Sequence, residues 1–371
     1  MAKIPHIIID ARLYGPKNTG IGRYTKNLLL AVKSLPDFKK YKFTLIIQKD
    51  ALSEIKTDLG QSYNYYPVNI PHYSLKEQLI LPFIIYQLKA DLVHFTHFNK
   101  PIFYLNNSLV TIHDLIKHLS TGKDTTTQNQ AVYWLKHFAY RLISFMAIKT
   151  SKIIVPSNYW RDILIKKYQV KPQNITTTYE AVDPNFMHPI KDCRLKIEDY
   201  ILYTGNLYPH KNIQVVFEAL KKLPDIKLKI ISARSVFSQR AESLIKKFHL
   251  QKQVEFLGFV KDSDFPKIYS HSLALVHPSF LEGFSLTGLE AMSLNTPVIS
   301  SNSSCLPEIY QDSVLYFDPH LPQDLVNKIN LLKNNPKLRQ TLIKKGISQV
   351  KKYSWDKTAQ QTLDVYQKSL G

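Results

Sequence analysis

The feature that most constrains this chain is a series of short apolar segments separated by longer amphipathic segments. The apolar segments read as buried strands, and helix-like stretches such as 22–35 and 133–150 lie between them. This alternation is typical of an α/β protein with parallel sheets. In the first half of the chain, the predicted strands are 5–11, 42–48, 90–95, 108–114 and 151–157.

The pattern starts afresh in the second half, after a polar, proline-containing segment at 180–200. A chain of 371 residues with 44% hydrophobic content is long enough for two domains. Two series of strands therefore predict two doubly wound domains, joined within that segment. The predicted strands of the second series are 200–206, 227–233, 253–259, 273–279 and 296–301.

Composition excludes several protein classes. Cys193 and Cys305 are the only cysteines, which leaves no disulfide framework and no cysteine-based zinc site. The first residues lack the apolar core of a signal peptide. The most apolar segment, 78–88, contains Pro82 and is shorter than the ~20 residues that span a bilayer. We therefore expect a soluble, cytoplasmic protein.

The formal charge is +20, from 49 basic and 29 acidic residues. Most of the basic residues are lysines, which suit diffuse attraction to anionic surfaces better than the reading of bases. A lysine-rich coat on solvated helix faces explains the charge equally well.

In open parallel sheets, ligands bind beyond the carboxyl ends of the strands, so the turns that follow strands are the candidate sites. Within 15–24, Gly20 and Gly22 allow the backbone to approach an anion, although an ordinary flexible turn is the alternative. His113 and Asp114 close another strand. A histidine there can exchange a proton with a ligand, and a satisfied structural His–Asp pair is the alternative.

Two further turns follow strands of the second half. In 203–213, Gly205 provides the turn and Lys211 precedes a predicted helix, an arrangement that suits a diphosphate; a surface lysine is the alternative. In 279–294, Glu282 precedes a predicted helix and Glu290 lies about one turn inside it. The amides at that helix start can hold an anion.

Together and in this order, the four turns resemble the retaining GT-B glycosyltransferases of family 4, which include many bacterial mannosyl- and glucosyltransferases. The E-x7-E signature of that family reads here from Glu282 to Glu290, with Ser285 at the usual glycine and Thr287 at the frequent proline. The resemblance covers nearly the whole chain. Its matching stretches are "NTGIGRYTKNLL", "LVTIHDL", "VPSNYWRDIL", "GNLYPHKNI" and "YSWDKTAQQTLDVY".

The resemblance implies a GT-B architecture of two Rossmann-like domains that face a central cleft. The expected domains are 1–182 on the acceptor side and 183–354 on the donor side, with 355–371 as a helix that crosses back to the first domain. The implied activity is retaining transfer of a hexose from a nucleotide diphosphate sugar to a saccharide or lipid-linked acceptor, without metal or cofactor. The stretches 73–82 and 93–101 look most like mannosyltransferases that use GDP-mannose.

The resemblance also assigns roles to residues. Glu282 faces the hydroxyls of the transferred sugar, Lys211 neutralises the leaving phosphate, and His113 contacts the sugar near the reacting carbon. Glu290 binds the ribose, and the amides after Gly283 hold sugar and phosphate. The implied donor-binding set is Gly20, Gly205, Asn206, Lys211, Glu282, Gly283, Phe284, Ser285, Leu286, Thr287 and Glu290, with Phe259 and Val260 in the loop near the base.

Two residues depart from the family pattern. Asn206 stands where many relatives carry an arginine beside the donor phosphates, and Thr19 replaces the first glycine of the usual pair. An Asp-x-Asp triplet at Asp262 and Asp264 resembles the manganese site of other glycosyltransferases. It precedes a helical stretch, which favours an N-cap turn.

Two other functions remain open on the sequence. A sugar-nucleotide epimerase can share the two-domain architecture. A noncatalytic binder of nucleic acid or of a membrane surface would explain the charge, but the arginines are too scattered for a specific nucleic-acid groove. Because family relatives often act on lipid-linked acceptors, we expect peripheral contact with the anionic inner membrane face. Lysine pairs 39–40 and 166–167 are expected to matter more for it than 344–345 and 351–352.

Overall fold

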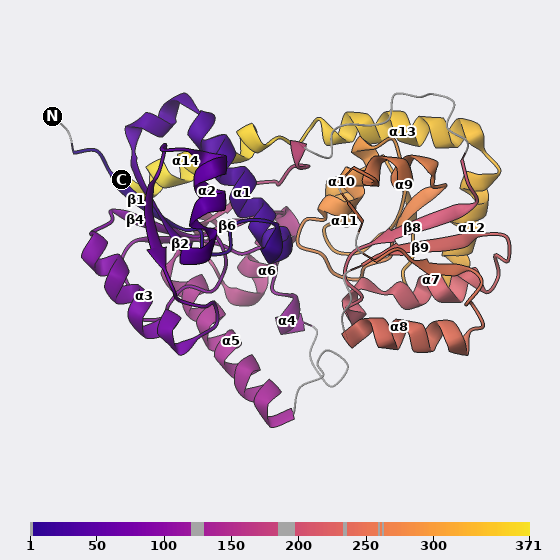
Figure 1. The fold of residues 1–371 in the computed structure, drawn as a ribbon, viewed down its shortest axis with the longest axis horizontal. Helices are drawn as coiled ribbons and strands as arrows, with labels where there is room; N and C mark the ends of the chain where they lie inside the picture. Colours follow the sequence, from indigo (N-terminus) through magenta and orange to yellow (C-terminus); the bar gives the residue numbers. More distant parts are fainter. Residues whose placement is uncertain (1–2, 120–129, 185–196, 233–235, 259, 262) are drawn as a thin grey trace. The chain divides into compact units, whose positions relative to one another are not determined.

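The computed structural model describes residues 3–119, 130–184, 197–232, 236–258, 260–261 and 263–371. The chain divides into two compact units (Figure 1). The first unit comprises residues 1–115, 128–180 and 354–371, and the second comprises 116–127 and 181–353.

The described part of the first unit is built on a parallel sheet of seven strands in the order β3-β2-β1-β4-β5-β6-β7. The order reverses between β1 and β4, so the loops that leave these two strands diverge at the carboxyl edge. The strands are β1 His6–Asp10, β2 Lys42–Gln48, β3 Asn64–Val68, β4 Leu92–Phe95, β5 Ser108–Thr111, β6 Lys152–Val155 and β7 Ile175–Thr177.

Helices pack on this sheet, and the last helix of the chain belongs to the same unit. Helix α14 (Trp355–Leu370) packs against α1 (Thr19–Ser34), and the hydroxyl of Tyr366 lies 2.7 Å from Nδ1 of His94 on β4. The other α-helices are α2 Leu52–Leu59, α3 Leu75–Leu88, α5 Gln130–Thr150 and α6 Asn158–Tyr168. Short 3-10 turns are η1 Pro16–Asn18, η2 Pro36–Lys40, η3 Lys49–Ala51 and η5 Pro172–Asn174.

The described part of the second unit repeats the design with six parallel strands in the order β10-β9-β8-β11-β12-β13. The strands are β8 Tyr200–Thr204, β9 Lys227–Ile231, β10 Val254–Phe256, β11 Ala274–His277, β12 Val298–Ser301 and β13 Leu315–Phe317. Its helical elements are α4 Ile116–Leu119, η7 Pro209–Lys211, α7 Ile213–Leu220, α8 Val236–Lys247, α9 Phe265–His271, α10 Leu286–Ser293, α11 Leu306–Tyr310, α12 Pro322–Lys333 and α13 Pro336–Val350. Among the described residues, no helix combines the length and apolarity needed to cross a membrane.

Every strand predicted from an apolar segment is present, whereas β3, β7 and β13 were not predicted. All three lie at an edge of their sheet. β7 and β13 are each three residues long, and β3 contains Pro67, a residue type confined to edge strands. The missed strands are therefore those with the weakest sequence pattern.

The predicted glycine turn before the first helix is wrong in detail. Helix α1 begins at Thr19, so Gly20 and Gly22 lie inside its first turns. A Cβ at Gly22 would lie 1.9 Å from the carbonyl oxygen of Gly15, so Gly22 is required where α1 touches the preceding loop. Gly20 is exposed and would meet nothing within 4 Å, and its backbone remains near the helix start.

The two glycines should therefore respond oppositely to alanine. Gly22→Ala should lower the free energy of unfolding by about 1–3 kcal/mol or more, because the added methyl group overlaps the Gly15 carbonyl. Gly20→Ala should raise it by up to about 1 kcal/mol through helix propensity. Urea unfolding followed by circular dichroism measures both. Equal effects of the two substitutions would contradict the close packing at Gly22.

Candidate active site

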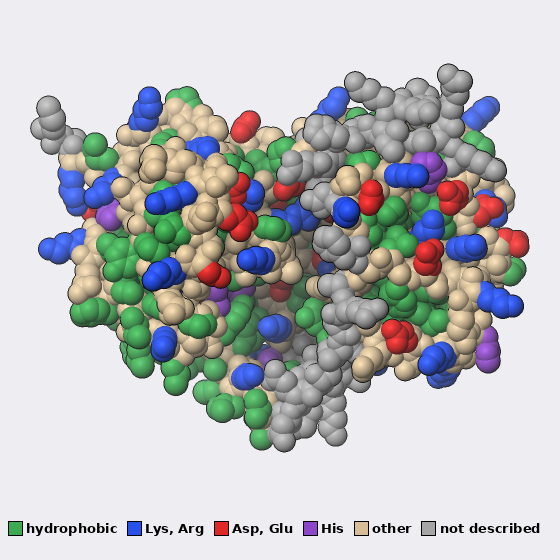
Figure 2. Space-filling view, in the orientation of Figure 1, with side chains coloured by type: hydrophobic (Ala, Val, Ile, Leu, Met, Phe, Trp, Pro, Cys, Tyr) green, Lys and Arg blue, Asp and Glu red, His purple; other side chains and the backbone are tan. Residues whose placement is uncertain are grey.

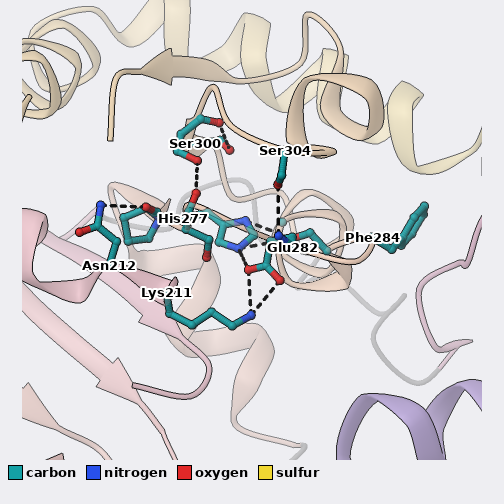
Figure 3. A network of polar contacts seen from close by, with 12 residues as sticks. Lys211, Asn212, His277, Glu282, Phe284, Ser300 and Ser304 are labelled. Atoms are coloured by element: carbon teal, nitrogen blue, oxygen red, sulfur yellow. Dashed lines mark hydrogen bonds and ion pairs between the residues drawn. The ribbon is translucent and has the colours of Figure 1, made fainter. Parts of the chain in front are cut away.

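The loops that leave β8 and β11 bring a lysine and a glutamate together. The two strands are parallel neighbours, so their carboxyl ends adjoin. Lys211 ends η7 after β8, and Glu282 lies in the turn between β11 and α10. The ammonium of Lys211 donates hydrogen bonds of 2.8 Å to both carboxylate oxygens of Glu282 (Figure 3).

His277, the last residue of β11, completes this arrangement. Its Nε2 lies 2.9 Å from Oε1 of Glu282, and because a carboxylate only accepts, we assign the proton to Nε2. Burial by itself would raise the pKa of Glu282, but the charge of Lys211 and the hydrogen bond from His277 lower it well below its usual range. Glu282 is therefore a carboxylate at neutral pH.

A tyrosine from α11 fixes the other side of the imidazole. The Tyr310 hydroxyl lies 3.0 Å from Nδ1 of His277 and accepts a 3.1 Å hydrogen bond from the amide of Gly288 in α10. A Cβ at Gly288 would lie 2.3 Å from the Tyr310 hydroxyl. The glycine inside the E-x7-E motif therefore makes room for the tyrosine that orients His277.

Ser285, at the position where the sequence resemblance sets a glycine, has a backbone conformation that favours glycine. Its φ of 85° lies in the left-handed region, where residues other than glycine are strained. Its hydroxyl makes no capping hydrogen bond to α10 and lies instead 2.6 Å from the Tyr310 hydroxyl and 3.1 Å from Nδ1 of His277. These side-chain contacts hold the strained turn in place.

Further hydrogen bonds tie the surrounding loops together. Asn212, at a φ of 54°, donates its side-chain amide to the carbonyls of Pro278 (3.2 Å) and Pro319 (2.9 Å). The amide of Glu282 donates to the hydroxyl of Ser304 at 3.1 Å. Loops after β8, β11, β12 and β13 are thus joined at one edge, as Figure 3 shows for Asn212 and Ser304. These hydrogen bonds fix the four loops relative to one another.

The other predicted donor-binding residues of the second unit lie around this edge. Gly205 has a φ of 137° at the end of β8, and the exposed Asn206 accepts a hydrogen bond from Tyr203 through its carbonyl. Glu290 is buried one turn inside α10, as predicted. The remaining ones are Gly283 and Phe284 in the turn, Leu286 and Thr287 in the first turn of α10, and the half-buried Val260 after β10. Phe259 lies outside the described residues.

His113, two residues after β5, and Gly20, in the first turn of α1, both belong to the first unit. Its Nδ1 lies 3.1 Å from the Glu180 carboxylate and its Nε2 lies 3.0 Å from the Thr96 carbonyl. Burial lowers the pKa of His113, but Glu180 outweighs it, so the pKa is raised. Because both ring partners are acceptors, the ring carries two protons. The hydrogen-bond partner is Glu180 where the sequence suggested Asp114. Because both N–H groups are used within the protein, the ring cannot take a proton from a ligand and could donate to one only by giving up a present partner.

One residue of the Asp-x-Asp triplet lies where a helix starts, as predicted. Asp264 occupies the N-cap position of α9, although its side chain makes no capping hydrogen bond, and Asp262 lies outside the described residues. Among the residues that the structure describes, no group of three or more histidine, cysteine or acidic side chains is placed to hold a metal ion.

Sequence reasoning missed His277 and Tyr310. His277 ends an apolar strand, as the sequence predicted for His113, so the same rule would have found it. Tyr310 gives no local signal, because it reaches the site from a helix far along the chain.

Comparison with known proteins finds family matches for both halves of the chain. The family described as "Glycosyltransferase Family 4" matches residues 19–186, and the family described as "Glycosyl transferases group 1" matches residues 194–349. O-antigen chain mannosyltransferase B of Escherichia coli is 26% identical, over 94% of this chain and 96% of that protein. O-antigen chain mannosyltransferase RfbU of Salmonella typhimurium is 26% identical, over 84% and 87%.

A solved structure agrees on the fold. The Anabaena protein HepE, crystallised with UDP and glucose, has a TM-score of 0.72 at 15% identity, and the match covers 98% of this chain and 100% of that one. The two parallel-sheet units are those of the GT-B fold. With both halves matched, the chain belongs to the group 1 and family 4 glycosyltransferases and is itself a glycosyltransferase.

Proposed function

We propose that this glycosyltransferase moves mannose from GDP-mannose to a saccharide or lipid-linked acceptor, with retention of anomeric configuration and without a metal ion. The observation that carries the proposal is the Lys211–Glu282–His277 arrangement beside the start of α10. The names of the two O-antigen mannosyltransferases support mannose, and they support cell-surface polysaccharide as the product. The reaction would take place at the cytoplasmic face of an anionic membrane.

The leaving group is the first requirement of this chemistry. As the sugar–phosphate bond breaks, negative charge grows on the diphosphate, and fixed donors aimed at it stabilise the transition state. An ammonium has three protons, and Lys211 gives two of them to Glu282, which leaves one direction for a phosphate oxygen. The amides at the start of α10 supply further donors, because the Ser285 hydroxyl does not cap them.

Glu282 would accept hydrogen bonds from hydroxyl groups of the sugar. An ionised carboxylate accepts hydrogen bonds at both oxygens and donates none. Its lowered pKa rules out a role as general acid at neutral pH. Glu290 would bind the ribose hydroxyls, and Phe259 and Val260 would lie near the base.

Retention would follow from attack on the same face of the sugar that the phosphate leaves. The departing phosphate oxygen takes the acceptor proton, so no protein base is required at that step. His113 would contact the sugar near the reacting carbon, and to donate a hydrogen bond there its Nε2 would exchange the Thr96 carbonyl for a sugar oxygen.

A panel of nucleotide sugars tests the donor directly. Incubation with GDP-mannose and an acceptor extract should release GDP, while UDP-glucose, UDP-galactose and UDP-N-acetylglucosamine should release no UDP. The released nucleotide is measured by chromatography. UDP release would contradict the proposed donor, and isomerisation of an intact nucleotide sugar would support the epimerase instead.

Loss of the Lys211 ammonium should slow transfer strongly. Removal of one preorganised donor to a developing anion costs about 10²- to 10³-fold in rate, and we expect this range for kcat of Lys211→Ala. Lys227→Ala is the matched control, because Lys227 is exposed at the start of β9, at the end of the strand away from the carboxyl edge. A reduction of less than about threefold, far below that range, would show that another group neutralises the phosphate.

Chelation tests the metal-free mechanism. Initial rates in excess EDTA should equal those in buffer, because lysine and helix amides carry the neutralising role that a divalent cation has in other enzymes. Loss of activity in EDTA, restored by added manganese, would mean that the reaction depends on a metal.

A further inference from the structure

A cavity of about 290 Å³ lies at the amino edge of the first sheet, at the ends of the strands away from His113. It is bordered by the segments that lead into three neighbouring parallel strands, β5, β6 and β7. Among the described residues that line it are Lys149 and Lys152, together with hydroxyl and asparagine side chains, and none is an aspartate or glutamate. The lining therefore combines positive charge with hydrogen-bond donors, which suits an anion.

A buried lysine lies behind this lining. Lys100 is only 2% exposed, and its ammonium donates hydrogen bonds to the hydroxyls of Ser108 (2.8 Å), Thr150 (2.9 Å) and Ser151 (3.2 Å). All three hydroxyl residues line the cavity. Among the residues that the structure describes, no carboxylate contacts this ammonium. Its positive charge therefore stands directly behind the wall of the cavity.

This buried charge costs free energy unless an anion lies near it. Hydroxyl groups satisfy the protons of an ammonium, but they do not neutralise its charge. Burial lowers the pKa of Lys100 to about 8, which is still above neutral pH, so the side chain remains protonated. An apolar side chain of similar length would fill the same space without the cost of a buried charge. The uncompensated charge therefore points to a ligand of opposite sign.

The hydroxyl groups carry the charge of Lys100 toward the cavity. A hydroxyl that accepts a hydrogen bond from an ammonium keeps one proton to donate. Thr150 donates its proton to the Met146 carbonyl at 2.7 Å. The hydroxyls of Ser108 and Ser151 lie 2.9 Å apart, so one of them donates to the other. Because Ser108 is buried and Ser151 is half-buried, Ser151 is the one placed to donate into the cavity.

The two lysines of the lining also have protons left to donate. The ammonium of Lys149 donates to the Tyr168 carbonyl at 2.8 Å, and that of Lys152 donates to the Lys368 carbonyl at 2.6 Å. An ammonium carries three protons, so each lysine has others for a ligand. Carbonyl groups hold both side chains in place without cancelling their charge.

The overall charge of the chain does not locate this site. Figure 2 shows lysine and arginine side chains scattered over both units. Exposed charges of this kind are screened by water and salt, so each attracts an anion weakly. The cavity differs because Lys100 is buried behind it, where less water screens its charge.

We propose that this cavity binds a small soluble oxyanion, either inorganic phosphate or a phosphate monoester. The oxyanion would accept hydrogen bonds from Lys149, Lys152 and the hydroxyl of Ser151, while Lys100 supplies positive charge from behind. We call this the amino-edge site. It does not rest on the proposed function, and it belongs to the first unit, whereas Lys211 belongs to the second.

One chain segment joins the amino-edge site to the carboxyl edge of the same sheet. Residues 96–107 lead from the end of β4 back to the start of β5. Near the beginning of this segment, the ring of His97 lies 6.4 Å from that of His113, and Lys100 follows in the same segment. A ligand that binds only the folded protein stabilises it, so an oxyanion at the site would hold this segment more firmly in place.

Calorimetric titration with inorganic phosphate measures the site. Lys100→Met keeps a side chain of similar length and removes its charge, so phosphate should bind this variant about tenfold more weakly or worse. Lys149→Ala with Lys152→Ala should have an effect of the same order. Circular dichroism establishes that each variant is folded. If Lys100→Met does not fold, Ser151→Ala gives the same comparison, because it removes the hydroxyl donor at a half-buried position.

Two control variants separate the amino-edge site from other positive charges. Lys246→Ala with Lys247→Ala removes two exposed lysines of α8 in the second unit, and it should bind phosphate as the wild type does. Lys211→Ala removes the cation of the candidate active site and should keep the same binding. Loss of phosphate binding in either control, with binding retained in Lys100→Met, would overturn the proposal.

Hydrogen–deuterium exchange locates the bound phosphate. Saturating phosphate should slow exchange in peptides that cover 96–108 and 149–152, and it should leave exchange in Lys100→Met unchanged. Slower exchange confined to peptides of the second unit would assign the phosphate to another site and contradict the proposal.

Three kinds of phosphate separate the sources of the oxyanion. Inorganic phosphate or a hexose phosphate should bind the wild type in solution. Binding only to vesicles that contain phosphatidic acid would assign a lipid phosphate instead and overturn the proposal, as would the absence of any phosphate binding. Because these titrations contain no donor sugar, their failure would leave the proposed transfer reaction untouched.

Discussion

The ion pair between Lys211 and Glu282 is the interaction on which the candidate site depends. Glu282 is almost completely buried, and a buried carboxylate is stable only when charge and hydrogen bonds compensate for the lost water. Lys211 supplies the charge and His277 the further hydrogen bond. Tyr310 and Asn212 in turn fix the imidazole and the loops, so the second unit holds a polar network ready for hydroxyls and phosphate.

Much of this site could be predicted from the sequence because its residues follow strands. Carboxyl ends of neighbouring parallel strands adjoin, so Lys211 after β8 and Glu282 after β11 come together once the strands are recognised. The contribution of Tyr310 could not be predicted this way. Its hydroxyl enters from α11, and its fit depends on the missing side chain of Gly288, a packing relation that no local pattern records.

Two residues that the sequence marked as departures from the family pattern share a strained backbone conformation. Thr19 and Ser285, which the resemblance to the family sets at usual glycine positions, both adopt a left-handed φ, of 54° and 85°. Such strain costs on the order of 1–3 kcal/mol and persists only where the surroundings hold it. At Ser285 the side-chain contacts to Tyr310 and His277 do so. No local sequence pattern indicates the contacts that make the left-handed φ tolerable at Ser285.

The central claim is that Lys211 and Glu282 act as one unit, and a double-mutant cycle on kcat/KM tests it most directly. If the account holds, the double variant of Lys211→Ala and Glu282→Gln will be about as slow as the slower single variant. This is expected because each substitution alone already breaks the Lys211–Glu282 ion pair, which orients the other side chain. Effects that multiply fully in the double variant would show two independent residues and contradict the account.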